Sequence, residues 1–483
     1  MKKINLIILV IISVLLSNCS NDFLAVEQRD ALLDDGTLVN GDDGAKSLVT
    51  AIYAKFLDWN ISSFSWIGVS SIITDDADKG SEPGDTGADK DLLDNLTFNA
   101  SSPSFNDVYR GYYQAIGRAN YAIQQLPLIT QADPNLRKRL EGEAKCLRAF
   151  SYFNMVRMFG PIPLVDHVAV QGNEEDKLML VQRKPVNDIY TFIEKDLTDA
   201  IVALPNKSAY PYGERARVSQ GTAQALMAKV KLYQQQWQAV ITFTDQMSGY
   251  SLVADYASIF KLAGEFNAES IFEINGYGGD PARGIQQYSQ TQGARGSGGW
   301  GWGFNTPTTS LVQAYEPNDK RKAATIIFAG QTLYDGRVVP ATAANPRYNY
   351  KAYSSVNSGD ANTDTNIKYL RYSEVLLMRA EAFNELGSTS SAIAELNKVR
   401  VRAGLPVTTA STQVALRIAI WKERRVELAF EHDRWFDLIR TKQAQAALAL
   451  DGKTFVVGKH ELFPIPQSVV DESNGVTTQN PGY

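Results

Sequence analysis

The chain has very few of the side chains on which metal sites and nucleophilic catalysis depend. It contains three histidines and two cysteines, and none of them has the spacing of a zinc site. A Gly-x-Ser-x-Gly nucleophile elbow and a Gly-x-x-x-x-Gly-Lys phosphate loop are both missing. We therefore expect no metal, no cofactor and no enzymatic activity. A glycosidase pair stays open as an alternative, because carboxylates are abundant and two acids need to meet only in the folded protein.

A strong charge of either sign and long apolar runs are also missing. The 48 basic and 53 acidic residues give a net charge of −5, which argues against binding to a nucleic-acid backbone. A membrane-spanning helix needs ~20 consecutive apolar residues. The apolar stretch near the start of the chain, Leu6 to Leu16, is shorter than that, and no longer one follows. We therefore expect neither nucleic-acid binding nor a transmembrane helix.

The first 19 residues have the layout of an export signal. A basic start, Met1-Lys2-Lys3, precedes the apolar stretch, and Cys19 follows at the expected distance. The segment Leu16-Ser17-Asn18-Cys19 resembles a bacterial lipobox, in which the cysteine receives a diacylglyceryl group. Residues 1–18 are therefore predicted to be a lipoprotein signal peptide, with an ordinary secretory signal as the alternative. Each buried acyl CH₂ contributes about 0.8 kcal/mol to membrane binding, so we expect the lipid on Cys19 to anchor the protein.

Most of the remaining chain has the apolar periodicity of helices. Apolar residues recur every three or four positions over about 105–126, 136–159 and 186–204. Two further segments, 223–247 and 372–399, read as helical hairpins of about 30 residues, a size that resembles a degenerate tetratricopeptide repeat. The sequence therefore predicts a mostly α protein, with a helical platform over about 40–250 and 367–445.

The segment between these two helical parts has a different composition. Ten of the 35 glycines lie between Gly276 and Gly303, where no regular helix is expected, because glycine costs up to about 1 kcal/mol relative to alanine. The segments 270–274 and 366–370 have the alternation or β-branched content of short strands. We predict a loop-rich insertion with short strands over about 250–366, and loops of this kind often carry recognition.

Several motifs in the chain resemble those of the SusD/RagB family of outer-membrane lipoproteins from Bacteroidota. Asn21-Asp22-Phe23-Leu24 after Cys19 is similar to the mature start of that family. The matching segments further along are Arg371–Ala382, Leu396–Leu405, Glu423–Glu431, Arg434–Arg440, Phe463–Gln467 and Gln479–Tyr483. His432-Asp433 departs from the family pattern, which usually has glycine and a polar residue there. The resemblance covers nearly the whole chain and implies one SusD-like domain over residues 19–483.

The resemblance implies a binding protein rather than an enzyme. SusD-like lipoproteins lie on the cell exterior over a SusC-like TonB-dependent transporter, where they capture oligosaccharides or, in some members, peptides. We therefore expect a surface-exposed, lipid-anchored outer-membrane protein that binds a glycan and delivers it to such a transporter. Three alternatives remain: a peptide-binding RagB-like lid, a helical-repeat scaffold that binds only protein, and a surface glycosidase.

Aromatic side chains in loops are the candidates for glycan contact, because flat rings stack on the apolar face of a sugar. The candidates are Trp300, Trp302 and Phe304 in the glycine-rich stretch, and Trp59, Phe64 and Trp66 near the first helix. For the two loop tryptophans, packing within the loop is an equal alternative. The resemblance adds Asp43, Asp75 and Arg371 as polar candidates, although a buried ion pair or a helix cap is the favoured interpretation for them.

Two groups of charged residues are interpreted without a ligand. The acidic stretch that begins at Asp75-Asp76-Ala77-Asp78 is interpreted as a solvated charge run, with calcium binding as the alternative. The charged residues of the C-terminal motif alternate with apolar ones, which predicts charges paired inside a rigid platform. They are Arg424, Arg425, Glu427, Glu431, Arg434 and Asp437.

Overall fold

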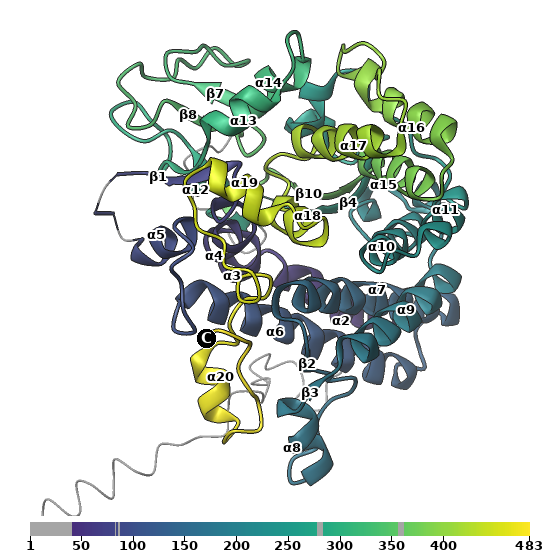
Figure 1. The fold of residues 1–483 in the computed structure, drawn as a ribbon. Helices are drawn as coiled ribbons and strands as arrows, with labels where there is room; N and C mark the ends of the chain where they lie inside the picture. The colour runs from purple at the N-terminus through teal and green to yellow at the C-terminus, as the bar shows by residue number, and fades with distance from the viewer. Residues whose placement is uncertain (1–40, 83, 86, 278–283, 356–361) are drawn as a thin grey trace, which may run out of the picture.

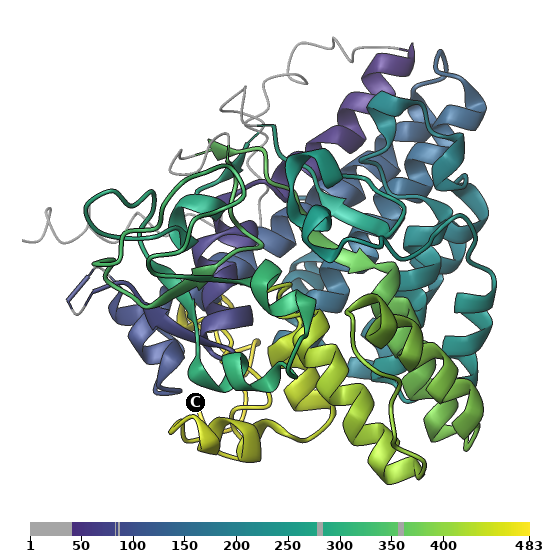
Figure 2. The same cartoon turned by 90° about the horizontal axis from the view of Figure 1, so that it is seen from above.

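The computed structural model describes residues 41–82, 84–85, 87–277, 284–355 and 362–483. The predicted signal peptide and Cys19 lie outside these residues. Within them, the expectation of a mostly α protein is confirmed: long helices make up one side of the molecule, and short strands and loops make up the other (Figures 1 and 2). No helix of the described part of the chain is long and apolar enough to cross a membrane.

Four long helices form the first half of the helical side. They are α2 (Gly41–Lys55), α6 (Pro103–Gln125), α7 (Pro134–Phe159) and α9 (Val186–Ala203), with α7 packed between α6 and α9. Their ends follow from local sequence. Asp133 caps α7 by accepting a hydrogen bond from the amide of Leu136 at 2.8 Å, and Gly160 ends it with a φ of 69°. The three helices predicted over this part are confirmed.

Both predicted hairpins are also present. The first joins α10 (Gln220–Tyr233) to α11 (Trp237–Asp245), and the second joins α15 (Tyr372–Glu385) to α16 (Thr389–Arg402). Helix α11 packs against α15, and α17 (Gln413–Glu427) packs against α15 and α16. The two hairpins are therefore neighbours in space although the loop-rich insertion separates them in the sequence (Figure 1).

Five two-stranded antiparallel sheets occur among the described residues, and four of them involve the insertion. Strand β4 (Ser270–Ile274) pairs with β10 (Ile367–Arg371), so the two predicted strands close the insertion at its base. Strand β1 (Ala77–Gly80) pairs with β6 (Phe304–Pro307), which ties the early part of the chain to the glycine-rich stretch. The other pairs are β2 (Ile162–Pro163) with β3 (Arg183–Lys184), β5 (Ile285–Gln286) with β9 (Asn362–Thr363), and β7 (Ile326–Phe328) with β8 (Arg347–Asn349).

Short helical elements complete the fold. Those before the insertion are α3 (Trp59–Ser62), α4 (Phe64–Ile67), η1 (Gly68–Ile72), α5 (Ala88–Asp94), η2 (Leu126–Leu128), α8 (Glu174–Val181), η3 (Lys207–Ala209) and η4 (Tyr212–Glu214). Those within it are η5 (Tyr256–Phe260), η6 (Leu262–Gly264), α12 (Tyr288–Gln292), α13 (Thr309–Ala314) and α14 (Lys320–Thr325). The C-terminal ones are α18 (Arg434–Arg440), α19 (Ala444–Leu450) and α20 (Gln467–Glu472). One large apolar core lies under the long helices, and smaller clusters lie under the insertion.

Candidate functional site

Four aromatic side chains from two distant parts of the sequence meet where α3 and α4 face the insertion. The ring of Phe64 is the centre: its centroid lies 5.7 Å from that of Trp59, 6.3 Å from that of Trp302 and 4.8 Å from that of Phe304. Trp59, Phe64 and Trp302 are partly exposed, whereas Phe304 is buried beneath them. We call these four residues the aromatic platform.

The β1–β6 ladder brings the two halves of the platform together. Gly80 is the register partner of Phe304, and its φ of 68° places it in the left-handed region that favours glycine. A Cβ on Gly80 would lie 2.5 Å from the carbonyl oxygen of Gly303, so the strands approach too closely for any other residue. Two hydrogen bonds of its main chain hold Trp302 in position. Its amide donates to the carbonyl of Gln290 at 2.8 Å, and its carbonyl accepts from Ser81 Oγ at 2.8 Å.

A planar amide side chain borders the platform. The exposed Gln286 accepts a hydrogen bond from the main-chain amide of Trp59 through Oε1 at 3.1 Å, and the main-chain amide of Gln286 donates to the carbonyl of Leu57 at 3.2 Å. Aromatic faces combined with planar hydrogen-bonding groups suit the alternating apolar faces and hydroxyl edges of sugars. Nothing in the local sequence marks Gln286.

Charged groups around the platform are already paired with one another. Lys90 Nζ lies 4.2 Å from the centroid of the Phe64 ring and donates to Asp89 at 2.8 Å. Burial lowers the pKa of Lys90, and Asp89 only partly offsets this effect. Beside Trp302, Arg295 holds both carboxylate oxygens of Asp85 at 2.8 and 2.9 Å. The hydrogen bond from Ser81 is the main reason why the pKa of Asp85 is lowered.

The structure does not bring every aromatic candidate to this surface. Trp66 is fully buried, edge-on to Tyr112 and stacked on Phe436, and therefore offers no face to a ligand. Trp300 is 7% exposed and packs within the loop against Tyr353, with the Arg337 guanidinium 5.1 Å from its ring centroid. Of the two equal interpretations of the loop tryptophans, packing describes Trp300, while Trp302 is partly exposed.

The polar candidates lie in other environments. Arg371 is buried and donates to Glu427 at 2.9 Å and to Glu431 at 2.6 Å, so the favoured ion-pair interpretation is confirmed for it. Asp75 is likewise held by Arg434 through two hydrogen bonds of 2.8 and 2.7 Å. Although burial acts in the opposite direction, Arg434 holds the pKa of Asp75 below its usual value. Asp43 is exposed in the first turn of α2.

The interpretation of the acidic stretch as a solvated charge run is wrong. Asp75 and Asp76 are 1% and 2% exposed, because Arg425 and Arg434 of the C-terminal motif fold onto them. Nothing in the local sequence could reveal these partners, which lie about 350 positions away. Among the residues that the structure describes, no group of three or more His, Cys, Asp or Glu side chains could hold a metal ion.

The predicted pairing of charges in the C-terminal motif is confirmed. Glu427, fully buried on α17, accepts hydrogen bonds from Arg321 at 3.1 Å, Arg371 at 2.9 Å and Arg402 at 2.5 Å. Although burial alone would raise it, these guanidinium groups hold the pKa of Glu427 well below its usual value. Arg321 belongs to the insertion and Arg371 to the strand at its base. The network therefore fixes the insertion, which carries Trp302 and Phe304 of the aromatic platform, against the helical side.

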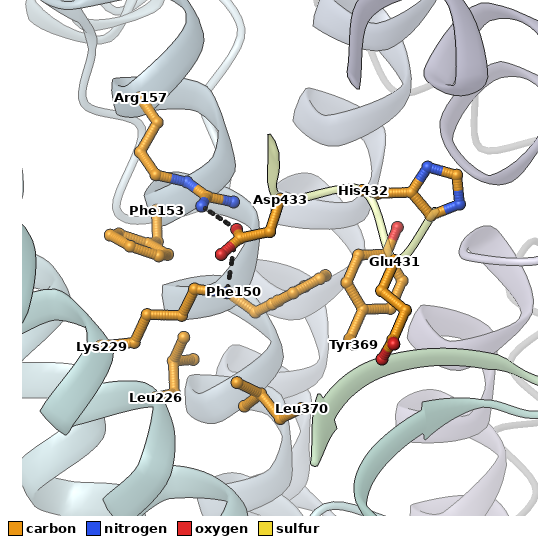
Figure 3. A pocket seen from close by; sticks show the side chains of 10 residues that line it. All are labelled: Phe150, Phe153, Arg157, Leu226, Lys229, Tyr369, Leu370, Glu431, His432 and Asp433. Carbon is orange, nitrogen blue, oxygen red and sulfur yellow. Dashed lines mark hydrogen bonds and ion pairs between the residues drawn. The ribbon is translucent and has the colours of Figure 1, made fainter. Parts of the chain in front are cut away.

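A small pocket lies between α7, α10 and the segment before α18 (Figure 3). It is lined by Phe150, Phe153, Arg157, Leu226, Lys229, Tyr369, Leu370, Glu431, His432 and Asp433. Asp433 binds Arg157 and Lys229, each at 3.0 Å. The free volume of about 10 Å³ is room for a single water molecule and not for a sugar ring, so this pocket is a structural feature.

His432 at the edge of this pocket is also structural. Its Nδ1 lies 2.9 Å from Ser70 Oγ and its Nε2 lies 3.2 Å from the hydroxyl of Tyr288. Burial lowers the pKa of His432 to about 4, so the ring is neutral near pH 7. Its φ of 66° lies in the left-handed region that favours glycine.

Comparisons with known proteins agree with the architecture. A family profile described as the SusD family matches residues 268–483, and one described as starch-binding and associating with the outer membrane matches residues 80–232. The SusD-like protein P2 of Formosa agariphila is 28% identical over 478 residues, which cover 90% of this chain and 92% of that protein.

Solved structures show the same fold over nearly the whole chain. A laminarin-binding SusD-like protein is 29% identical, with a TM-score of 0.78 over 92% of this chain and 100% of the other. A SusD-like protein from Bacteroides fragilis is 25% identical, with a TM-score of 0.77 over 93% and 98% of the two chains. Surface glycan-binding protein A from Bacteroides thetaiotaomicron, solved with laminarihexaose, is 23% identical with a TM-score of 0.77 over 91% and 100%. At 23% identity, the comparison with this last protein shows a shared fold only.

Proposed function

Because the chain belongs to the SusD/RagB family, we propose that it binds a glycan at the cell surface through the aromatic platform. The bound glycan is then delivered to a SusC-like TonB-dependent transporter in the outer membrane. The single observation that carries the glycan assignment is the meeting of Trp59, Phe64 and Trp302 as partly exposed rings. A relative that covers nearly all of this chain is described as laminarin-binding, which supports a glycan as the ligand class.

The platform has the features that sugar recognition in water requires. A pyranose ring buries its apolar face on an aromatic side chain, and amide groups then orient the hydroxyls at its edge. Here the rings come from rigid elements, since Trp59 and Phe64 lie on short helices and Phe304 lies on a strand beneath them. Gln286 supplies an amide beside Trp59. Rings that are held in place in the free protein lose little conformational entropy when a ligand binds.

The test is a binding measurement with matched tryptophan variants. Isothermal titration of the purified protein against a panel of oligosaccharides, with laminarihexaose included, should identify a ligand. Trp59→Ala and Trp302→Ala should each weaken its binding about tenfold, because the loss of one stacked ring costs ~1.4 kcal/mol. Trp237→Ala is the control, since Trp237 is a half-buried tryptophan on α11 of the helical side. Wild-type affinity in both platform variants would refute the assignment, as would a panel in which only peptides bind.

The protein is proposed to act without catalysis. One family profile is described as starch-binding and one similar structure as laminarin-binding, and the described residues near the platform include no histidine or cysteine. Incubation with each glycan that binds should release no reducing ends. Turnover that survives further purification and is lost on substitution of a carboxylate near the platform would establish a glycosidase instead.

The lipid anchor and the transporter are proposed from the N-terminal motif and the family. Mild detergent extraction of native outer membranes should recover the protein together with a large β-barrel protein in fixed proportion. Recovery of the protein alone, in a detergent that preserves other membrane complexes, would contradict the role as a lid on a transporter.

A further inference from the structure

We propose that the aromatic platform takes neutral glycans and discriminates against those that carry uronic acid or sulfate groups. This inference rests on the proposed function, because it assigns the charge class of the ligand at the same site. It follows from how the charged side chains around the platform are paired, among the residues that the structure describes.

Within the described part of the chain, the cations that border the platform, Lys79, Lys90 and Arg295, are each engaged by a carboxylate. Lys90, under the ring of Phe64, donates to Asp89 at 2.8 Å and to Ser104 Oγ at 2.6 Å, and its side chain is 3% exposed. Lys79 of β1 binds Asp91 at 2.8 Å, and its side chain is 7% exposed. Neither ammonium group is available to an anionic ligand without the loss of its present partner.

Arg295 lies at the Trp302 edge of the platform, with Nη1 3.5 Å from the carbonyl oxygen of Trp302, and two carboxylates surround it. Asp85 takes both of its terminal nitrogens, and Glu82 lies 3.4 Å from Nε. A hydrogen bond from Ser81 and another from the amide of Glu82 fix Asp85 in this position. One guanidinium against two carboxylates leaves this edge with a net negative charge, and the Glu82 side chain is 53% exposed.

These charges act differently on neutral and anionic sugars. A hydroxyl group can donate a hydrogen bond to Asp85 or Glu82, so a neutral glycan gains partners along this edge. The carboxylate of a uronic acid or a sulfate ester group offers only acceptors and meets like charge there. It must also be partly dehydrated against the aromatic rings, and no described cation is free to compensate. Binding of the neutral ligand should therefore be nearly independent of salt, because no ion pair forms or breaks.

The experiment compares one neutral and one anionic oligosaccharide of equal length at low and physiological salt. Laminarihexaose and an alginate hexasaccharide serve as the probes, titrated against the purified protein at 20 and 150 mM NaCl. We expect laminarihexaose to bind at least tenfold more tightly, with less than a twofold change in its Kd between the two salt concentrations.

A charge variant tests the stated cause. Asp85→Asn frees Arg295 from its bidentate partner, and the affinity for the alginate hexasaccharide relative to laminarihexaose should rise at least threefold at 20 mM NaCl. Glu385→Gln is the matched control, since Glu385 of α15 makes the same bidentate contact with Arg417, at 2.6 and 2.6 Å, on the helical side. It should leave the relative affinity unchanged, and thermal unfolding should show that both variants are folded.

Two results would overturn the inference and leave the proposed function standing. One is tighter binding of the alginate hexasaccharide, weakened by salt, in the wild-type protein. The other is an unchanged relative affinity in Asp85→Asn when the protein is folded. Failure of every glycan in the panel to bind would overturn the proposed function, and this inference with it.

Discussion

Replacement of Glu427 by glutamine removes the negative charge at the centre of the buried network and retains the size of the side chain. Three guanidinium groups donate to this carboxylate, and each also has another acid partner: Arg321 binds Glu423, whereas Arg371 and Arg402 both bind Glu269. Loss of one partner of a buried ion pair costs about 3–5 kcal/mol. Because the arginines keep their other partners, we expect the lower end of that range, a loss of about 3 kcal/mol in the free energy of unfolding at pH 7.

The dependence on pH identifies the cause. The pKa of Glu427 in the folded protein lies well below the usual value of 4.5. The charged carboxylate therefore contributes its full stabilisation above pH 4.5, and this contribution is lost as the pH falls from 4.5 toward the pKa of Glu427 in the folded protein. The difference between the wild type and Glu427→Gln should therefore be largest at neutral pH and shrink below about pH 4.5. A difference that persists unchanged at pH 3.5 would show that packing, and not charge, is responsible.

Urea denaturation followed by tryptophan fluorescence at pH 7 and at pH 3.5 measures both quantities. Glu385→Gln is the control, because the Glu385–Arg417 pair is partly exposed and should contribute about 1 kcal/mol or less. A loss of less than 1 kcal/mol for Glu427→Gln at pH 7 would refute the view that this network holds the insertion against the helical side.

Three further predictions follow from the anchor, the strand pair beneath the platform and the buried histidine. Cys19→Ala should leave a folded protein that moves from the membrane to the soluble fraction, as seen by immunoblot; retention in a strain without the transporter would contradict lipid anchoring. Gly80→Ala should lower stability by about 2 kcal/mol and weaken glycan binding, because its Cβ would meet the Gly303 carbonyl. Gly336→Ala, with a φ of 87° and open space around the Cβ, should cost only about 1 kcal/mol in thermal or urea unfolding; equal losses would show that the clash is unimportant. Neutral His432, with its pKa of about 4, stabilises the fold above the unfolded value of 6.5, and this contribution is lost as the pH falls toward 4. Between pH 7 and pH 4, the wild type should therefore lose up to about 3 kcal/mol more stability than His432→Asn in urea titrations. Asparagine is chosen because it tolerates a positive φ. Parallel pH profiles of the two proteins would refute the assignment.

Much of the helical side could be predicted because its signals are local. The apolar periodicity of α6, α7 and α9 and the breaks at Gly160 and Gly387 depend only on neighbours within one or two turns. The alternation of charge and apolar residues around Glu427 likewise indicated pairing in the interior. This alternation could not show which residues pair with the motif, because Arg321 and Glu269 come from the insertion.

The candidate site could be predicted only in part. Aromatic residues in a glycine-rich loop have no helix core to join, and this left ligand contact and packing within the loop as equal interpretations of Trp300 and Trp302. The tertiary structure separates them: Trp302 packs against Phe64, and Trp300 turns inward onto Tyr353. Trp66 lies only two positions from Phe64 but is buried in the main core, whereas Phe64 is partly exposed. This difference in exposure depends on which face of α4 meets distant residues of the main core.

The sequence by itself determined the helices, their ends, the position of the loop-rich insertion and the paired charges of the C-terminal motif, because each depends on short-range periodicity and backbone preference. The tertiary structure alone decided which aromatic rings share a surface and which acids meet which arginines. Those contacts join residues hundreds of positions apart, and they form only when the β1–β6 and β4–β10 ladders bring the two halves of the chain into register.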